Sequence, residues 1–234
     1  MIRRWTRPAA NRVRRWRGTM ATPWQRALGR FEFVFMDHAF FRHIKLNLHQ
    51  VTPQMWRSAQ PSPSHIARMA RQGVRTVINL RGARDCATYL LEQQACRRHG
   101  LTLVDFPLTS REPPSPDRIA AFDRMLAQIE YPAVMHCKSG ADRAGIGAAL
   151  YLMLREGRPL ADAQAQLHWR FGHVRQSPTG VLDYMLERYA AALGNEGIDF
   201  REWVRRGFDP LAMRAEFRAG RAGTFLVERI LRRE

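Results

Sequence analysis

The chain has 234 residues, 45% of them hydrophobic, and a formal net charge of +17. This length allows one domain of good size with extensions, and the apolar share is enough to form a core. No apolar run approaches the roughly 18 residues that a membrane span requires, which argues against a spanning helix. The three cysteines are an odd number in a chain of this length and argue against a disulfide framework.

The excess positive charge is concentrated at the two ends of the chain. Residues 1–30 carry nine arginines and no acidic residue, and residues 201–234 carry nine arginines against five acidic residues. Three tryptophans lie among the arginines of the first segment, a composition that suits contact with an anionic membrane surface. A solvated tail without fixed structure is the alternative. We expect no nucleic-acid partner, because neither basic end contains a recognition motif.

The hydrophobic pattern predicts strands that alternate with helices. Residues 31–48 are rich in phenylalanine and are expected to pack as a helix on the domain that follows. The alternation indicates the α/β class, as a three-layer α-β-α fold with a mainly parallel central sheet of four to five strands. In chain order, we predict a strand or hairpin at 51–58, a helix at 63–72, a strand at 74–80, a helix at 89–99, a strand at 101–106, a helix at 116–129, a strand at 131–136, and helices at 143–155, 159–169 and 179–193.

This pattern divides the chain into three parts. Residues 1–47 are expected to form a basic, aromatic-rich N-terminal extension, residues 48–193 the α/β domain, and residues 194–234 a helical, basic C-terminal extension. The start of the chain lacks the apolar core and the cleavage site of a secretory signal. We therefore expect a cytoplasmic location, with peripheral contact of residues 1–30 to the inner membrane as an additional hypothesis.

The segment 136–145 reads His-Cys-Lys-Ser-Gly-Ala-Asp-Arg-Ala-Gly and lies between a predicted strand and a predicted helix. A loop of this kind can hold a phosphate-sized anion with backbone N–H groups, the helix N-terminus and the guanidinium of Arg143. Cys137 would lie at the bottom of the loop, where positive potential favours the nucleophilic thiolate. The alternative is a buried structural cysteine beside a helix-capping Asp142.

This segment resembles the signature loop of the cysteine-dependent protein tyrosine phosphatase superfamily, in which His-Cys is followed by five residues and Arg. Residues 57–61, Arg-Ser-Ala-Gln-Pro, resemble the opening of bacterial and fungal dual-specificity-type phosphatases. The resemblance covers about residues 50–192 and implies that the domain at 48–193 is phosphatase-like. It implies an enzyme that hydrolyses phosphomonoesters through a cysteinyl-phosphate intermediate, as a phosphotyrosine or dual-specificity protein phosphatase. The alternatives are a phospholipid headgroup phosphatase at the membrane surface and a pseudophosphatase module that only binds phosphate.

The resemblance implies a role for each residue of the loop. Cys137 is the expected nucleophile, and Arg143 is expected to grip two phosphate oxygens bidentately. His136 is expected to order the loop and support the thiolate. Gly140 lets the backbone turn toward the phosphate. The expected phosphate-binding residues are Lys138, Ser139, Gly140, Ala141, Asp142 and Arg143.

The general acid departs from the family pattern. The family usually supplies an aspartate from the loop after the strand at 101–106, where alignment by eye places Ser110. Asp142 is the first candidate, since an aspartate directly before the arginine also occurs in myotubularin-like lipid phosphatases, beside the leaving group. Glu112 is the second candidate. The alternative role of Asp142 is a helix cap or a partner for a nearby arginine.

Ala144 is a second departure from the pattern. The family commonly has a serine or threonine there, which donates a hydrogen bond to the departing sulfur. Because this donor is missing, breakdown of the phosphoenzyme is expected to be slow.

No metal or other cofactor is implied by the sequence. The eight histidines lack the spacing of metal ligands, and His168 and His173 are expected to be packing or surface residues. The expected partner is a phosphorylated protein or a phospholipid substrate.

Overall fold

The structure, a computed structural model, describes residues 46–231. The predicted helix at 31–48 and the N-terminal extension therefore lie almost entirely outside the described residues. The chain divides into two compact units, which we describe separately. Of the described residues, the first unit holds 46–107 and 131–136, and the second holds 108–130 and 137–231.

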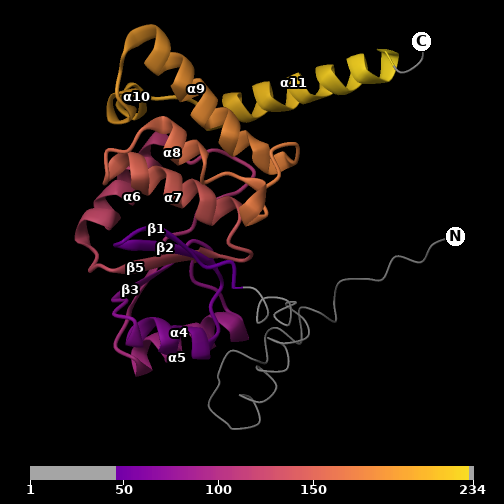
Figure 1. Ribbon diagram of the computed structural model, residues 1–234. Coiled ribbons are helices and arrows are strands. Elements are labelled where there is room, and N and C mark those ends of the chain that lie inside the picture. Colours follow the sequence, from indigo (N-terminus) through magenta and orange to yellow (C-terminus); the bar gives the residue numbers. More distant parts are fainter. Residues whose placement is uncertain (1–45, 232–234) are drawn as a thin grey trace, which may run out of the picture. The chain divides into compact units, whose positions relative to one another are not determined.

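A five-stranded sheet forms the centre of the first unit (Figure 1). Its strands are β1 (His49–Thr52), β2 (Met55–Ala59), β3 (Thr76–Asn79), β4 (Thr102–Asp105) and β5 (Ala133–Cys137). Their order is β1-β2-β5-β3-β4, with an antiparallel hairpin at β1 and β2, and with β3 parallel to both β4 and β5. Asn79 stands opposite Asp105 on one side and His136 on the other. The carboxyl ends of three parallel strands therefore meet at one edge of the sheet.

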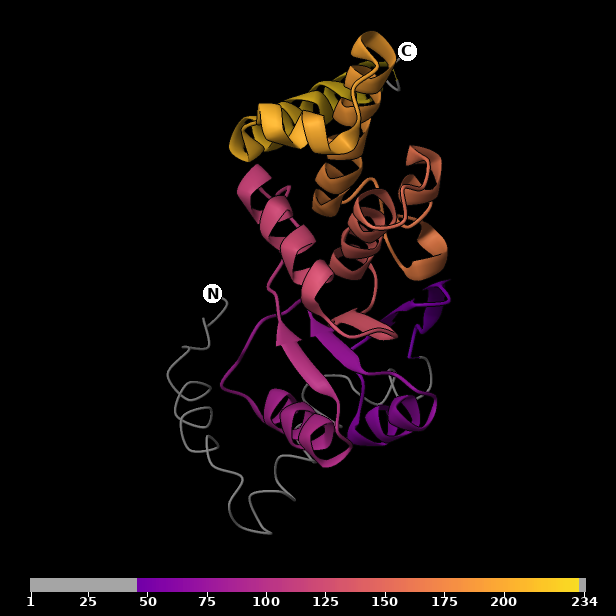
Figure 2. The ribbon, with the colours of Figure 1, turned by 90° about the vertical axis from the view of Figure 1, so that its left-hand side faces the viewer.

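Two helices, α4 (Pro63–Arg71) and α5 (Ala87–Arg98), lie side by side on one face of this sheet (Figures 1 and 2). α4 begins at a capping box, in which the Ser62 side chain accepts a hydrogen bond from the backbone N–H of His65. Pro63 occupies the first helical position, where its missing N–H costs nothing. The helices and strands share a core of buried apolar side chains: Ile66, Met69, Val77, Ala95, Cys96 and Val134.

The second unit consists mainly of helices. They are α6 (Pro116–Gln128), α7 (Asp142–Leu154), α8 (Leu160–Gln164), α9 (Val181–Glu196), α10 (Phe200–Arg206) and α11 (Pro210–Leu231), with short 3₁₀ helices at Trp169–Phe171 and Pro178–Gly180. α6 begins at Ser115, whose side chain accepts a hydrogen bond from the N–H of Arg118. α7 is buried along most of its length. A cluster of aromatic rings joins α9 to the segment that follows it: Tyr189, Phe200, Trp203 and Phe208.

The predicted α/β class with a mainly parallel sheet is confirmed, and most elements lie close to their predicted bounds. The single long helix predicted at 159–169 is wrong. α8 ends at Gln164, and a separate 3₁₀ helix covers Trp169–Phe171. The reason is local, because the His168 side chain accepts a hydrogen bond from the N–H of Arg170 and starts a new turn. Gly172, with a φ of +82°, then ends that turn.

α11 is the longest helix of the described chain, at 22 residues. Charged residues recur along its sequence. Neither α11 nor any other helix within residues 46–231 combines the length and the apolar character needed to cross a membrane.

Candidate active site

The loop between β5 and α7 carries the predicted catalytic residues. Cys137 is the last residue of β5 and is 2% exposed, and Arg143 lies in the first turn of α7. Gly140 has a φ of +75°, a left-handed conformation that any side chain would strain. Ala141 precedes α7 and has no side chain able to cap it, so the first N–H groups of the helix have no capping side chain. The predicted sequence of strand, tight loop and helix is therefore present.

The charged groups of this loop suit an anion. Lys138 and Ser139 are exposed, and Arg143 is half-buried. Among the described residues, no carboxylate forms an ion pair with Arg143. An arginine that keeps its donors unpaired beside a helix N-terminus matches the charge and shape of a phosphate group. The assignment of these residues to phosphate binding remains a prediction.

In the first unit, a buried chain of polar side chains leads to His136, the residue before Cys137. His136 Nε2 lies 2.5 Å from Glu92 Oε1, and both side chains are fully buried. Gln60 Nε2 donates to Glu92 Oε2 at 2.9 Å, and the Arg81 guanidinium donates to Gln60 Oε1. These contacts place the buried Glu92 carboxylate against the His136 ring, in the strand that leads to the nucleophile.

The sequence prediction missed Glu92. The residue lies on α5 among buried neighbours that include Leu91, Ala95 and Cys96. Burying a carboxylate on a helix face raises the free energy of the fold unless the carboxylate is paired. An acidic residue among the apolar positions of this helix is therefore the one sign in the sequence that Glu92 has a buried partner. The helix at 89–99 and the strand at 131–136 are both predicted from the sequence, but the contact between Glu92 and His136 is not.

The other acidic candidates have structural partners. Asp105 Oδ1 accepts a hydrogen bond from Asn79 Nδ2 at 2.7 Å, and Asp105 Oδ2 accepts one from the Tyr89 hydroxyl at 2.5 Å. Burial, together with the hydrogen bond to Asp105, raises the pKa of Tyr89 to about 12. Glu112 forms an ion pair with Arg214 of α11 at 3.2 Å. Of the two predicted acids, Asp142 is the one that lies in the loop itself.

Asp142 is bound to a histidine rather than capping the helix. Its Oδ1 lies 2.7 Å from His173 Nδ1, while His173 Nε2 lies 2.7 Å from Asp183 Oδ2. The helix cap position belongs to Ala141. The prediction that His173 packs or lies at the surface missed this bridge, although the residue is indeed buried. Three segments far apart in sequence meet here, and no residue spacing signals the contact.

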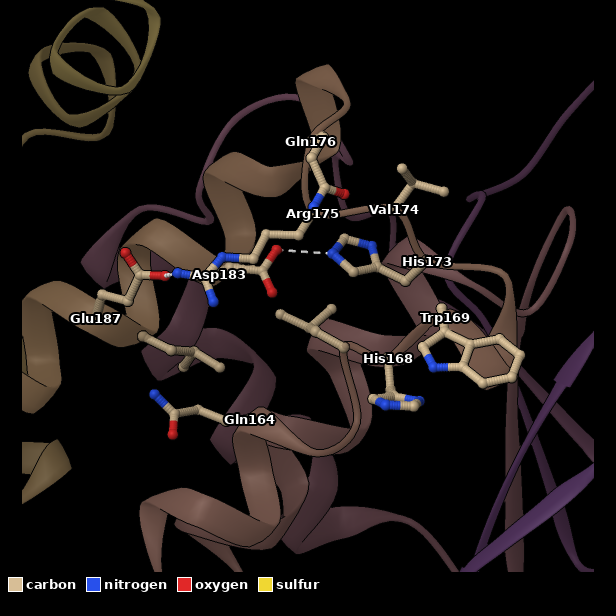
Figure 3. Close-up of a pocket in the computed structure, with 11 residues that line it drawn as sticks. Gln164, His168, Trp169, His173, Val174, Arg175, Gln176, Asp183 and Glu187 are labelled. Atoms are coloured by element: carbon tan, nitrogen blue, oxygen red, sulfur yellow. Dashed lines mark hydrogen bonds and ion pairs between the residues drawn. The ribbon is translucent and has the colours of Figure 1, made fainter. Parts of the chain in front are cut away.

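A cavity of about 430 Å³ adjoins this histidine (Figure 3). Its wall includes Asp183 and the ion pair between Arg175 and Glu187, at 2.5 Å. Trp169 lies at the cavity and is 76% exposed. The remaining lining residues are Gln164, Leu167, His168, His173, Val174, Gln176 and Leu186.

The stability of the fold is expected to depend on the charge of His173. Burial disfavours the imidazolium, but hydrogen bonds to Asp142 and Asp183 outweigh it and raise the pKa of His173 from 6.5 to about 9. A raised pKa means that the stabilisation is complete below pH 6.5 and is lost as the pH rises through about 9. The difference corresponds to about 3 kcal/mol. Denaturant unfolding of wild type should show this loss, and His173→Gln should lack most of it; equal pH dependence in both proteins would contradict the assignment.

A family model described as "DSP-PTPase phosphatase fused to NAD+ Kinase" matches residues 23–176. Two curated relatives are the dual specificity protein phosphatase TpbA of Pseudomonas aeruginosa in two strains. One is 28% identical over 113 residues, covering 48% of this chain and 49% of TpbA, and the other is 29% identical over 132 residues, covering 54% and 56%. A beta-lactamase hydrolase-like protein of Xylella fastidiosa is 34% identical over 136 residues, which cover 57% of this chain and 30% of that protein. The chain thus spans about half or less of the length of these relatives.

The fold agrees with this family. The crystal structure of P. aeruginosa TpbA matches with a TM-score of 0.51 and 23% identity, covering 65% of this chain and 93% of TpbA. Both the predicted resemblance to bacterial dual-specificity-like phosphatases and the predicted fold class are therefore confirmed. The family model covers well over half of the chain, and the chain belongs to the DSP-PTPase phosphatase family that this model describes.

Proposed function

We propose that the protein is a cysteine-dependent phosphatase that hydrolyses phosphomonoesters, with phosphotyrosine-type protein substrates as its first substrate class. One observation carries the proposal: the loop from Cys137 to Arg143 joins a strand end to an uncapped helix start, and Arg143 has no carboxylate partner among the described residues. Membership of the phosphatase family supports it. We further propose that residues 48–193 form the phosphatase domain and that 1–47 and 194–234 are extensions.

In the first chemical step, the Cys137 thiolate attacks phosphorus. A sulfur–phosphorus bond forms while the bond to the leaving oxygen breaks. The leaving oxygen keeps the electron pair of the broken bond and takes a proton from Asp142, which enters this step in its protonated form. Arg143 and the backbone N–H groups of residues 138–143 stabilise the charge on the remaining phosphate oxygens. His136, fixed by Glu92, supports the strand end that presents the thiolate.

In the second step, water attacks phosphorus and gives its proton to Asp142. The sulfur–phosphorus bond breaks, inorganic phosphate forms, and Cys137 leaves as a thiolate. Ala144, fully buried on α7, offers no hydroxyl to this sulfur. Breakdown of the phosphoenzyme is therefore the expected slow step.

Rapid-mixing kinetics with p-nitrophenyl phosphate test the proposed function. In the presence of excess chelator, we expect a burst of nitrophenol of about one equivalent per enzyme, followed by slower turnover. Acid quenching during turnover should leave phosphate on Cys137, detectable by mass spectrometry of the peptide. Loss of activity on chelation, or turnover without any trapped phosphocysteine, would contradict the mechanism.

A phospholipid headgroup is the second candidate substrate, and the nine arginines and three tryptophans of residues 1–30 favour it. These residues would hold a cytoplasmic enzyme at the anionic inner membrane; they lie outside the described residues. Deletion of residues 1–30 is expected to lower activity on phosphatidylglycerol phosphate in anionic vesicles by about tenfold and to leave activity on soluble phosphopeptides unchanged. Equal activity on vesicles with and without the segment would rule out the membrane role.

A further inference from the structure

We infer that His173 and Asp183 are positioning residues that hold the Asp142 carboxylate in place within the phosphate-binding loop. The inference rests on the proposed function, because it takes Asp142 as the group that exchanges a proton with the leaving oxygen and with water. Both residues lie outside the signature loop, on the segment and helix that follow α7 and α8.

Three separate elements supply the three side chains. Asp142 begins α7, His173 follows the 3₁₀ helix, and Asp183 lies in the first turn of α9. His173 lies 2.7 Å from an oxygen of each carboxylate, one at each ring nitrogen. A ring held through both nitrogens cannot turn without losing both bonds, so Asp142 Oδ1 is fixed. Asp142 Oδ2 makes no hydrogen bond with a described residue and remains available to a substrate or a water molecule.

His173 is the most buried of the three side chains, and Asp142, the one in the loop, is the most exposed. The side chain of His173 is 1% exposed, that of Asp183 is 13% exposed, and that of Asp142 is 26% exposed. The backbone also approaches the loop closely, because a Cβ built on Gly172 would lie 3.8 Å from the Cβ of Ala141, the residue before Asp142. The segment that carries His173 is thus packed against the start of α7.

The charge of His173 explains how a phosphate loop tolerates an internal carboxylate. In its ionised form, which accepts the proton of water in the second step, Asp142 alone would repel a phosphate dianion. An imidazolium between Asp142 and Asp183 neutralises one of the two negative charges. The raised pKa of His173 is consistent with this charge state. The other ion pair of the adjoining cavity, Arg175 with Glu187, is internally neutral. Burying a cation carries a desolvation penalty in free energy. If the position served packing alone, an apolar side chain would fill the same space without that penalty.

The leaving-group dependence of His173→Gln tests the inference. Loss of a positioned acid matters most when the leaving oxygen is strongly basic. We expect kcat/KM, which reports formation of the phosphoenzyme, to fall about 100-fold on phenyl phosphate and only about tenfold on p-nitrophenyl phosphate. The tenfold part reflects weaker binding of the phosphate group, which both substrates share. Asp183→Asn should act in the same direction by about tenfold, because His173 keeps only one of its two anchors.

A double-mutant cycle separates positioning from a general effect on the fold. On the Asp142→Asn background, His173→Gln should lower kcat/KM on phenyl phosphate by less than about threefold, because the carboxyl group that it positions is gone. His99→Gln is the matched control: this exposed histidine follows α5 in the first unit, and its contacts at the end of that helix are made by its backbone N–H. Its activity should equal that of wild type.

Two outcomes would overturn the inference. One is an equal loss on both substrates in His173→Gln; the other is a full multiplicative loss in the double variant. If His173→Gln does not fold, Asp183→Asn provides the same comparison.

Binding of inorganic phosphate, followed by NMR, keeps this inference separate from the proposed enzyme activity. Wild type should bind phosphate at the loop, and His173→Gln should bind it about tenfold more weakly because the charge of Asp142 is no longer compensated. An inactive wild type that shows this difference would refute the phosphatase proposal and keep the positioning role. Equal phosphate binding by both proteins would refute the positioning role, whatever the activity.

Discussion

Cys137→Ser is expected to lower kcat/KM on aryl phosphates by at least about 10⁴-fold. The serine hydroxyl is a far weaker nucleophile than a thiolate, because it stays protonated at neutral pH. Steady-state hydrolysis of p-nitrophenyl phosphate measures the loss. The variant should still bind inorganic phosphate, because Arg143 and the loop backbone are retained.

The other two cysteines provide the controls. Burial, followed by the nearby charges of Glu92 and Asp105, raises the pKa of Cys96 to about 12, so this thiol stays protonated and unreactive at neutral pH. Cys86 is partly exposed and lies 3.3 Å from the Thr88 hydroxyl. Cys86→Ser should retain full activity. Activity that survives in Cys137→Ser and disappears in Cys86→Ser would place the chemistry elsewhere in the chain.

The parts of the site that the sequence predicted are local ones. Cys137, Gly140 and Arg143 lie within a single short segment. The spacing of apolar residues predicts a strand before this segment and a helix after it. The loop could therefore be predicted as strand, turn and helix, and the described structure has that form. The same reasoning placed most helices and strands near their observed bounds, because each depends on the spacing of its own apolar residues.

The missed parts depend on contacts between distant segments. His173 lies 31 residues from Asp142 and 10 residues from Asp183, and no periodic pattern links the three. The long helix predicted at 159–169 continued an apolar pattern past the point where the His168 side chain competes for a backbone N–H. His173 directly follows Gly172, which ends the 3₁₀ helix after this break.

Arg143→Lys is expected to lower kcat/KM by about 10²- to 10³-fold although the charge is retained. An ammonium group is a point charge, whereas the guanidinium presents two parallel N–H donors that can follow two equatorial oxygens into the transition state. Among the described residues, no carboxylate forms an ion pair with Arg143. A lower kcat/KM in Arg143→Lys therefore cannot be attributed to a broken ion pair within the fold. Competitive inhibition by inorganic phosphate should weaken by only about tenfold, since charge alone accounts for part of ground-state binding.

Arg155→Lys on the same helix is the matched control for Arg143→Lys. Arg155 lies at the other end of α7, 3.8 Å from Asp123, and a lysine can keep that long contact. Its substitution should change kcat/KM by less than about twofold, because an exposed ion pair of this kind contributes little to stability.

Arg143→Ala completes the series. Its kcat/KM should be lower than that of Arg143→Lys, and the difference between the two variants measures what the charge alone contributes. If Arg143→Lys instead kept activity within about threefold of wild type, the bidentate grip would be unnecessary. The loop would then act through its backbone N–H groups and its net charge alone.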